Sequence, residues 1–477
     1  MSRLASSHCG RFGPPVLSRR EMLSRAGLGI GSLALANLLL DDGALADEAG
    51  AVARRDPAAK ARSLIFLFMG GGPSHVDTWD PKPLLARLHG KDVPESIAAR
   101  VPRIARSPLV NLMASPFRFA PRGSSGIEVS ELFQHVGSLV DELCVIRSCR
   151  HNTPIHAPAE YLSMTGTQVG DRPSLGSWLV YGLGSENASL PGFVVFTSDG
   201  NGRPTAWSSG FLPARYQATV VPGSQTIANL AMPPGVTDES RRAQLRLMDD
   251  LNRRHVAEHG PISELDARIR TYELAFRMQA AAPEAFDIAK ETDETHRLYG
   301  LDHKDTAEFG RHCLLARRLV ERGVRFVQLR SGNWDAHAKL AENHSERCRK
   351  TDRPIAALLT DLKRRGLLDE TLVIWGGEFG RTPAAQGGAT TAGRDHSPSG
   401  YSMWLAGGGV KGGQVIGATD EVGYAAIDSP VHPNDMHATI LHALGINEQH
   451  LYYTHHNRRE KVTVNGGTVV RRVFERA

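Results

Sequence analysis

Short runs of apolar residues recur along the chain, and each is followed by glycine or by a polar loop. Residues 63–69 read Ser-Leu-Ile-Phe-Leu-Phe-Met and are followed by three glycines and a proline. A continuous apolar run of this length predicts a strand that is buried on both faces. The same pattern predicts further strands at residues 143–146, 192–196, 324–329, 371–375 and 402–406.

Between these runs, apolar residues recur every three or four positions, which is the spacing of an amphipathic helix. It predicts helices over residues 261–281, 309–322, 353–365 and 435–444, and Gly323 and Gly366 stand where two of them end. Helix, glycine, buried strand and polar loop therefore follow one another repeatedly. This order predicts an α/β fold with a mostly parallel central sheet and helices on both faces.

The N-terminus carries the features of an export signal in the expected order. Arg19 and Arg20 precede an uncharged apolar stretch at residues 26–40, and Ala44 and Ala46 supply the small residues that a signal peptidase recognises. A paired arginine is typical of the twin-arginine route. The stretch is shorter than the ~20 apolar residues that span a bilayer. We therefore predict a signal peptide over residues 1–46, the twin-arginine machinery as a partner, and a periplasmic or otherwise exported protein. A retained anchor and an ordinary N-terminal helix are the alternatives.

The remaining chain divides into an Ala/Arg-rich linker at residues 47–62 and one α/β domain at residues 63–477, with a helical insertion around 240–320. Apolar residues make up 41% of the chain and charged residues 22%, which is typical of a soluble globular protein. The net charge is only +5 and the basic residues are scattered, so we expect no nucleic-acid partner. After the signal, no segment is apolar enough to form a stable transmembrane helix.

Four cysteines remain once the signal is removed: Cys144, Cys149, Cys313 and Cys348. They lack the Cys-x-x-Cys spacing of a metal site. Cys144 and Cys149 could form a disulfide in an oxidising compartment, and buried free thiols are the alternative.

Carboxylates and histidines gather directly after the predicted strands. The carboxyl ends of parallel strands meet at one edge of a sheet, so these side chains are expected to lie close together. The single residue between Asp335 and His337 places both side chains on one side of an extended segment. Any one of these residues alone would be an ordinary polar loop residue, but their recurrence favours a site for one or two divalent metal ions. Histidine favours Zn or Mn over Ca or Mg. The predicted metal ligands are Asp77, Asp335, His337, Glu378, Asp395 and His396.

Four segments make the sequence similar to a known family. Residues 66–83, 376–383, 393–396 and 405–413 resemble the signature of an exported bacterial family named only as domain of unknown function 1501. That family is grouped with the alkaline phosphatase/sulfatase superfamily, and the likeness covers nearly the whole mature chain. The resemblance implies an α/β sheet with one or two metals and a nucleophile at the strand ends.

The expected nucleophile is where the sequence departs from the superfamily. Sulfatases carry Cys or Ser at the position of His156, and Arg at the position of Glu160. The resemblance therefore implies no formylglycine chemistry at this place. Ser74 and Thr78 are alternative hydroxyls, and His156 could be a metal ligand or a nucleophile. His151 and His156 are candidates for proton transfer. Arg381 or Arg394 could bind an anionic group, with an ion pair to a carboxylate as the alternative for Arg394. The residues predicted as catalytic are His156, Ser74, His151 and Arg381.

These features predict an exported metal-dependent hydrolase of phosphate or sulfate esters, acting on a small anionic ester or on a sulfated or phosphorylated glycan. The physics of both reactions needs positive charge where the transferred group becomes negative. A catalytically degenerate member of the fold that acts as an exported binding or surface-associated protein is the alternative. Metal-dependent isomerase or mutase chemistry is also compatible with the resemblance.

Overall fold

The computed structural model describes residues 55–99, 110–198, 203–223, 235–259, 263–388 and 391–475. The predicted signal peptide lies outside these residues, so its assignment and the location of the protein remain predictions. Residues 55–62 of the predicted linker contact the domain: the Asp56 N–H donates to the Gly445 carbonyl (2.7 Å), and Ala61 is buried. Within the described ranges, we find no helix with the length and hydropathy that crossing a membrane requires.

The central element is an eight-stranded sheet with the order β12-β4-β11-β8-β1-β7-β5-β6. All six predicted strands belong to it, which confirms the predicted sheet. The apolar pattern missed the two short outer strands, β6 and β12. The strands are β1 (Ser63–Met69), β4 (Cys144–Cys149), β5 (Phe193–Thr197), β6 (Thr219–Pro222), β7 (Phe326–Ser331), β8 (Thr371–Gly376), β11 (Tyr401–Ala406) and β12 (Gln414–Ile416).

The sheet is mostly parallel, as predicted. β1 pairs in parallel with β7 and β8, and β5 pairs in parallel with β6 and β7. β11 is the exception, because it runs antiparallel to both β4 and β8. The carboxyl ends of β1, β5, β7 and β8 therefore lie at one edge. Outside the sheet, short antiparallel pairs include β2 (Phe119–Arg122) with β3 (Ile127–Ser130) and β9 (Gly380–Arg381) with β10 (His396–Ser397).

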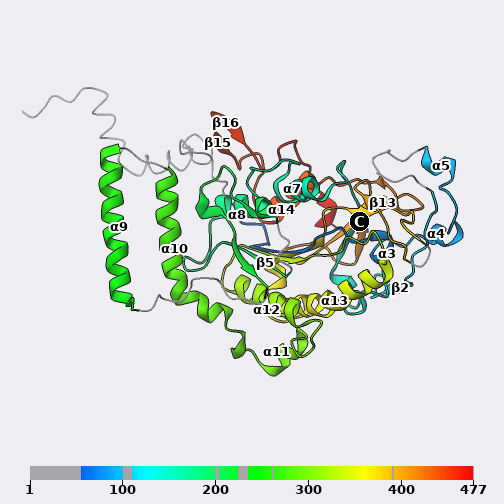
Figure 1. Ribbon diagram of the computed structural model, residues 1–477, viewed down its shortest axis with the longest axis horizontal. Helices are drawn as coiled ribbons and strands as arrows, with labels where there is room; N and C mark the ends of the chain where they lie inside the picture. The colour runs from blue at the N-terminus through cyan, green and yellow to red at the C-terminus, as the bar shows by residue number, and fades with distance from the viewer. Residues whose placement is uncertain are drawn as a thin grey trace, which may run out of the picture. The chain divides into compact units, whose positions relative to one another are not determined.

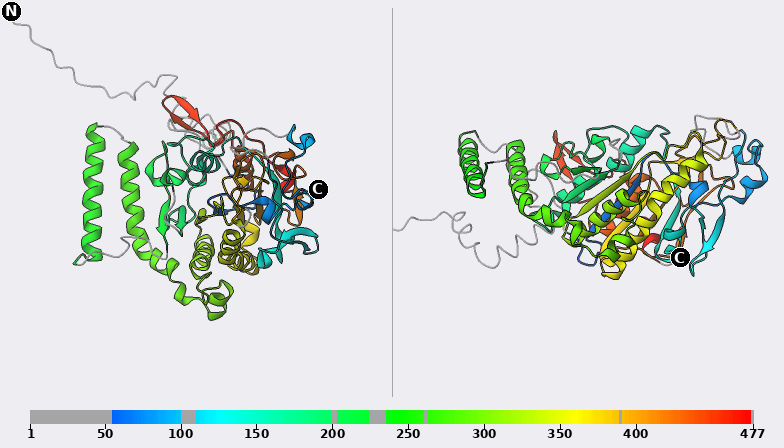
Figure 2. Two further views of the ribbon diagram at one scale, coloured as in Figure 1. Left: turned by 45° about the vertical axis from the view of Figure 1, so that its right-hand side comes forward. Right: turned by 60° about the horizontal axis from the view of Figure 1, so that its bottom comes forward.

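Helices cover both faces of the sheet (Figure 1). Alternate residues of β1 belong to two different cores: Ile65 and Leu67 pack in the cluster that contains α12 and α13, while Leu64 and Phe66 pack in the cluster that contains α8 and α14. Figure 2 shows α12 and α13 side by side against the sheet. The main helices are α7 (His156–Thr165), α8 (Leu175–Leu183), α9 (Asp238–His259), α10 (Ser263–Phe286), α11 (Asp293–Leu298), α12 (Ala307–Glu321), α13 (Leu340–Arg364) and α14 (Pro433–Ala443).

Two helix boundaries were predicted wrongly. Helix α10 ends at Phe286 and not near residue 281, and the larger difference is at the start of α13. Helix α13 begins at Leu340 and not at Arg353, and Pro354 lies inside it. Proline is common in the first turn of a helix and costly in its interior, so the sequence favoured a start beside Pro354. Residues on both sides of Pro354, such as Cys348 and Leu358, are buried in one core, and this packing favours a helix that continues through the proline.

The four described cysteines are buried free thiols. Cys144 and Cys149 are the first and last residues of β4, and they do not form a disulfide. Burial raises the pKa of the Cys144 thiol to about 12, so it stays protonated at ordinary pH.

Candidate metal centre

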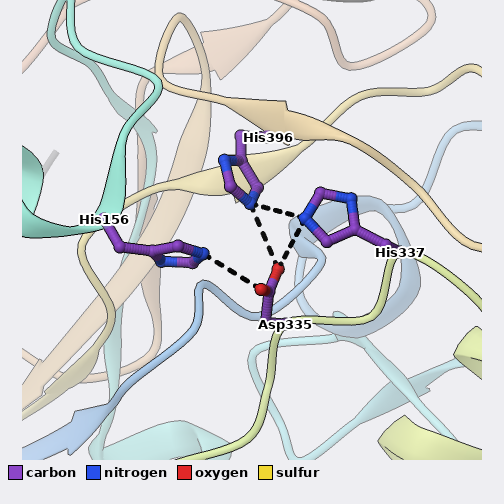
Figure 3. A group of neighbouring side chains, drawn as sticks. All are labelled: His156, Asp335, His337 and His396. Carbon is purple, nitrogen blue, oxygen red and sulfur yellow. Dashed lines mark hydrogen bonds and ion pairs between the residues drawn. The ribbon is translucent and has the colours of Figure 1, made fainter.

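Four side chains converge at the carboxyl edge of the sheet: His156, Asp335, His337 and His396 (Figure 3). One potential ligand atom from each lies within 4.8 Å of all the others. His156 is the first residue of α7, Asp335 and His337 lie in the loop after β7, and His396 begins β10. Segments far apart in the sequence therefore form one compact group. Three of its members are predicted metal ligands, and His156 is a residue predicted as catalytic.

The loop after β7 is held so that Asp335 and His337 face the same side. The intervening Ala336 is buried, and its carbonyl accepts a hydrogen bond from the Arg394 N–H (3.0 Å). Gly393 passes so close that a Cβ on it would lie 2.1 Å from the His337 carbonyl carbon. The chain can approach His337 this closely only because position 393 carries no side chain.

Gly393→Ala is therefore expected to lower the stability by about 1–3 kcal/mol, the usual cost of overpacking, and to weaken metal binding by displacing His337. Urea denaturation and a metal titration measure the two effects. Gly388→Ala in the same loop is the matched control, because its Cβ would meet Thr391 Oγ1 at an ordinary contact distance of 3.8 Å. Equal stability of the two variants would contradict this close approach.

Each of the three imidazoles is oriented by a hydrogen bond from its Nδ1 atom. His396 Nδ1 lies 2.7 Å from the Pro154 carbonyl oxygen, which can only accept, so Nδ1 carries the proton. His337 Nδ1 donates to the side-chain oxygen of Gln386 (2.7 Å), and His156 Nδ1 donates to Glu378 Oε1 (2.6 Å). A metal-ligating histidine commonly has its second ring nitrogen held in this way by a carbonyl or a carboxylate.

The three Nε2 atoms consequently point at the Asp335 carboxylate. His337 Nε2 and His396 Nε2 lie 3.0 and 3.1 Å from Asp335 Oδ1, and His156 Nε2 lies 3.2 Å from Oδ2. The Nε2 atoms of His337 and His396 are themselves only 2.9 Å apart. In neutral rings protonated at Nδ1, both carry lone pairs, which repel at this distance unless a cation lies beside them. The donor set therefore fits a divalent metal ion.

The electrostatics of the group agree with this fit. Burial raises the pKa of Asp335, but hydrogen bonds with His156 and His396 and the charge of Arg381 outweigh it and hold the pKa well below its usual range. Burial lowers the pKa of His156, but its hydrogen bonds with Asp335 and Glu378 raise it to about 9. Without a metal, a proton thus occupies Nε2 of His156, and metal binding would displace it.

Glu378, a predicted ligand, lies behind His156 and outside the group of four. Its Oε1 accepts from His156 Nδ1 and from the Gly71 N–H (2.9 Å). Burial raises the pKa of Glu378, yet the hydrogen bond with His156 brings it below its ordinary value. The carboxylate is therefore ionised and placed to orient His156 and to make its Nε2 more basic.

Glu378→Gln is expected to weaken metal affinity by about tenfold, because the amide keeps the shape but loses the charge that acts on His156. Competition with a chelator of known affinity measures the change. The exposed Glu342→Gln on α13 is the control. A loss far above a hundredfold would instead make Glu378 a direct ligand, and no loss would remove it from the site.

Asp77 and Ser74 belong to a separate buried network. Both oxygens of Asp77 accept from the Arg394 guanidinium (2.7 and 3.2 Å), and Ser74 Oγ donates to the same carboxylate. Arg394 also donates to the carbonyls of Thr382, Pro383 and Met113. Asp77, Ser74 and Arg394 are fully buried. The carboxylate that the resemblance assigns to a metal is thus paired with an internal cation.

The other predicted site residues lie around the cluster. Arg381 is fully buried and donates to Asp335 Oδ1 (2.6 Å) and to the carbonyls of Gly71, Gly72 and Arg394. Asp395 accepts from the His396 N–H (2.8 Å) and lies 3.8 Å from His337 Nδ1. His151 Nε2 donates to the Glu378 carbonyl (2.6 Å), and burial lowers the pKa of His151 to about 4. Their catalytic and ligand roles remain predictions.

Sequence reasoning missed Gln386 and Pro154, which orient two of the imidazoles. Gln386 stands in a loop with no apolar pattern around it, and Pro154 contributes only its backbone carbonyl. The only available indication for Pro154 was its position two residues before His156, between two histidines.

The sequence was also compared with protein families and with known proteins. The family model described as "Protein of unknown function (DUF1501)" matches residues 61–474. No curated protein matches the sequence. The predicted α/β fold with a mostly parallel central sheet is confirmed by the strand order and pairing of the chain itself. Solved structures with a partial likeness to the chain have low sequence identities to it.

Three of these neighbours illustrate the likeness. The PsFucS1 sulfatase from Pseudoalteromonas sp. is 14% identical, with a TM-score of 0.35 over 88% of this chain and 71% of that one. The phosphonate monoester hydrolase SpPMH from Silicibacter pomeroyi is 10% identical, with a TM-score of 0.37 over 88% and 77%. A protein in the alkaline phosphatase superfamily from Vibrio parahaemolyticus is 11% identical, with a TM-score of 0.33 over 83% and 69%.

Proposed function

The chain belongs to the DUF1501 family of proteins of unknown function, and from that premise and the geometry of the cluster we propose that it is an exported, metal-dependent hydrolase of phosphate or sulfate esters. One observation carries the proposal: three imidazole Nε2 atoms, each oriented through its own Nδ1–H, converge on one carboxylate. The ester class comes from the sequence resemblance to the alkaline phosphatase/sulfatase superfamily.

The donor set favours Zn or Mn. Three nitrogens and one carboxylate suit these ions, whereas Ca²⁺ prefers a shell of oxygens and Mg²⁺ prefers carboxylates and phosphates with several waters. Asp335 and His337 side chains are 39% and 38% exposed, so the group of four keeps one side open to a ligand. When bound, a divalent ion supplies the positive charge that acidifies water and offsets the negative charge of the transferred group.

Some residues of the site would bind the metal ion, and others orient the side chains that bind it. His156, Asp335, His337 and His396 would hold the ion. Glu378, Gln386 and the Pro154 carbonyl fix the three rings, and Arg381 fixes Asp335. We propose water as the attacking group, because both nitrogens of His156 face carboxylates and the Ser74 hydroxyl donates to Asp77 inside a buried network.

Hydrolysis by the metal-loaded full chain tests this function. The substrates are p-nitrophenyl phosphate, bis(p-nitrophenyl) phosphate and p-nitrophenyl sulfate, with chelated protein as the control. We expect metal-dependent release of nitrophenol from at least one of them. Bound metal without any turnover would contradict the hydrolase and favour the exported binding protein. Export itself is tested by replacing Arg19 and Arg20 with lysine, which is expected to retain the protein in the cytoplasm.

A further inference from the structure

Glu160 forms a charged group with two arginines, one helical turn from the metal centre. It lies on α7 four residues after His156, so the two side chains share one face of the helix. Arg330 Nη1 lies 2.7 Å from Glu160 Oε1, and Arg203 Nε lies 3.5 Å from Oε2. The side chains of Glu160 and Arg330 are 6% and 7% exposed, whereas Arg203 is 43% exposed.

The charges of this group do not balance. Arg330 makes the shorter contact with Glu160 and is fixed, because its guanidinium lies over the rings of Phe68 (4.8 Å) and Trp207 (5.2 Å). One buried carboxylate is thus already matched by one buried guanidinium. Arg203 is a surplus cation with a long contact and a half-exposed side chain, and such an exposed pair is weak.

Arg203 also lies on the side of the sheet edge that holds the metal centre. It follows β5, whose carboxyl end lies at the same edge as that of β7, and it directly precedes a short helix at Pro204–Trp207 that packs on α7. Burial raises the pKa of Glu160, and the negative charge of Glu378, the carboxylate that orients His156, raises it further. The surplus positive charge therefore lies against Glu160, one turn of α7 from His156.

The two arginines that the sequence favoured as anion-binding groups are differently placed. Arg381 and Arg394 are fully buried, and their guanidinium nitrogens donate to carboxylates and backbone carbonyls of the chain. A planar guanidinium binds a tetrahedral oxyanion well only when two of its N–H groups are free to donate to the oxyanion oxygens. Arg203 has that freedom.

We propose that Arg203 is the anion-binding residue of this site, and that its guanidinium binds the tetrahedral oxyanion of a phosphate or sulfate group lying at the metal centre. The inference rests on the proposed function for the identity of the site, but it concerns oxyanion binding and not turnover. Glu160 and Arg330 are positioning residues, since their ion pair joins α7 to β7 and places the Glu160 carboxylate that Arg203 contacts.

Binding of inorganic phosphate and of inorganic sulfate to the metal-loaded full chain tests this role by calorimetry. Arg203→Ala is expected to weaken binding of at least one of them by about tenfold, and Arg203→Lys to retain part of it. The anion with the higher affinity, phosphate or sulfate, identifies the group that the site prefers. Metal content should stay unchanged. Arg118→Ala is the matched control, because Arg118 is 90% exposed and pairs with Glu131 at the open end of the β2–β3 pair.

Unchanged phosphate and sulfate affinities in Arg203→Ala would overturn the proposal, as would an equal loss in Arg118→Ala. The failure of the proposed function has a different signature. If the wild-type chain binds metal and hydrolyses no ester, yet Arg203→Ala loses oxyanion affinity, then the hydrolase is contradicted and the role of Arg203 is supported.

Discussion

Replacing Asp335 by asparagine is expected to lower the affinity for Zn or Mn by about a hundredfold or more, a larger loss than the 10–100-fold typical of residues behind the ligands. Asp335 supplies the one carboxylate in the group of four, and all three Nε2 atoms point at it. An amide keeps the shape but brings no negative charge to the ion. Competition with a chelator measures the affinity, and circular dichroism checks the fold.

Asp305→Asn is a suitable control for this change. Asp305 pairs with Arg349 through a surface contact of 2.8 Å, away from the cluster. We expect it to leave metal affinity unchanged. If Asp335→Asn bound metal as tightly as the wild type, the group of four would not be the metal centre.

The second large effect is expected on stability and not on metal binding. Asp77→Asn should destabilise the metal-free chain by about 3–5 kcal/mol, because it leaves the Arg394 charge buried without its partner. Both side chains are fully buried and form a two-point ion pair. Urea denaturation without metal measures the loss. If Asp77 were instead a metal ligand, the change would appear in metal affinity while the metal-free chain kept its stability.

The same pair gives a pH dependence with a defined sign. Burial raises the pKa of Asp77, but the charge and hydrogen bonds of Arg394 lower it below its ordinary value in the folded chain. A carboxyl with a depressed folded pKa contributes stability above its unfolded pKa of about 4, and loses it as pH falls through the folded value. The stability difference between wild type and Asp77→Asn should therefore be largest near neutral pH and shrink in acid.

Much of the fold could be predicted because buried strands leave a strong pattern. Residues 63–69 form β1 with the predicted bounds, since every side chain in it faces a core. The outer strands β6 and β12 are short and partly exposed, so they leave no continuous apolar run. The start of α13 was missed because Pro354 mimics a helix beginning, and only tertiary packing explains its place inside the helix.

The sequence indicated which residues gather at the candidate site, but not which of them bind the metal and which support the ligands. Their positions near strand ends indicated Asp335, His337, His396 and His156 as candidate site residues. In the structure these four side chains lie together. The sequence could not separate them from Asp77 and Glu378, which are the same residue types after strands of the same sheet. The Asp77 carboxylate pairs with Arg394, which is 317 residues away in the chain. No local sequence pattern predicts this pair.

The metal stoichiometry and ligand set of the purified chain test the central claim most directly. After loading with Zn or Mn and dialysis, elemental analysis is expected to give about one equivalent per chain, and X-ray absorption to show imidazole nitrogens and a carboxylate oxygen around the ion. The Asp335→Asn variant should lose that equivalent. A chain that retains no metal after loading, or one whose bound metal is coordinated by oxygens alone, would contradict the account.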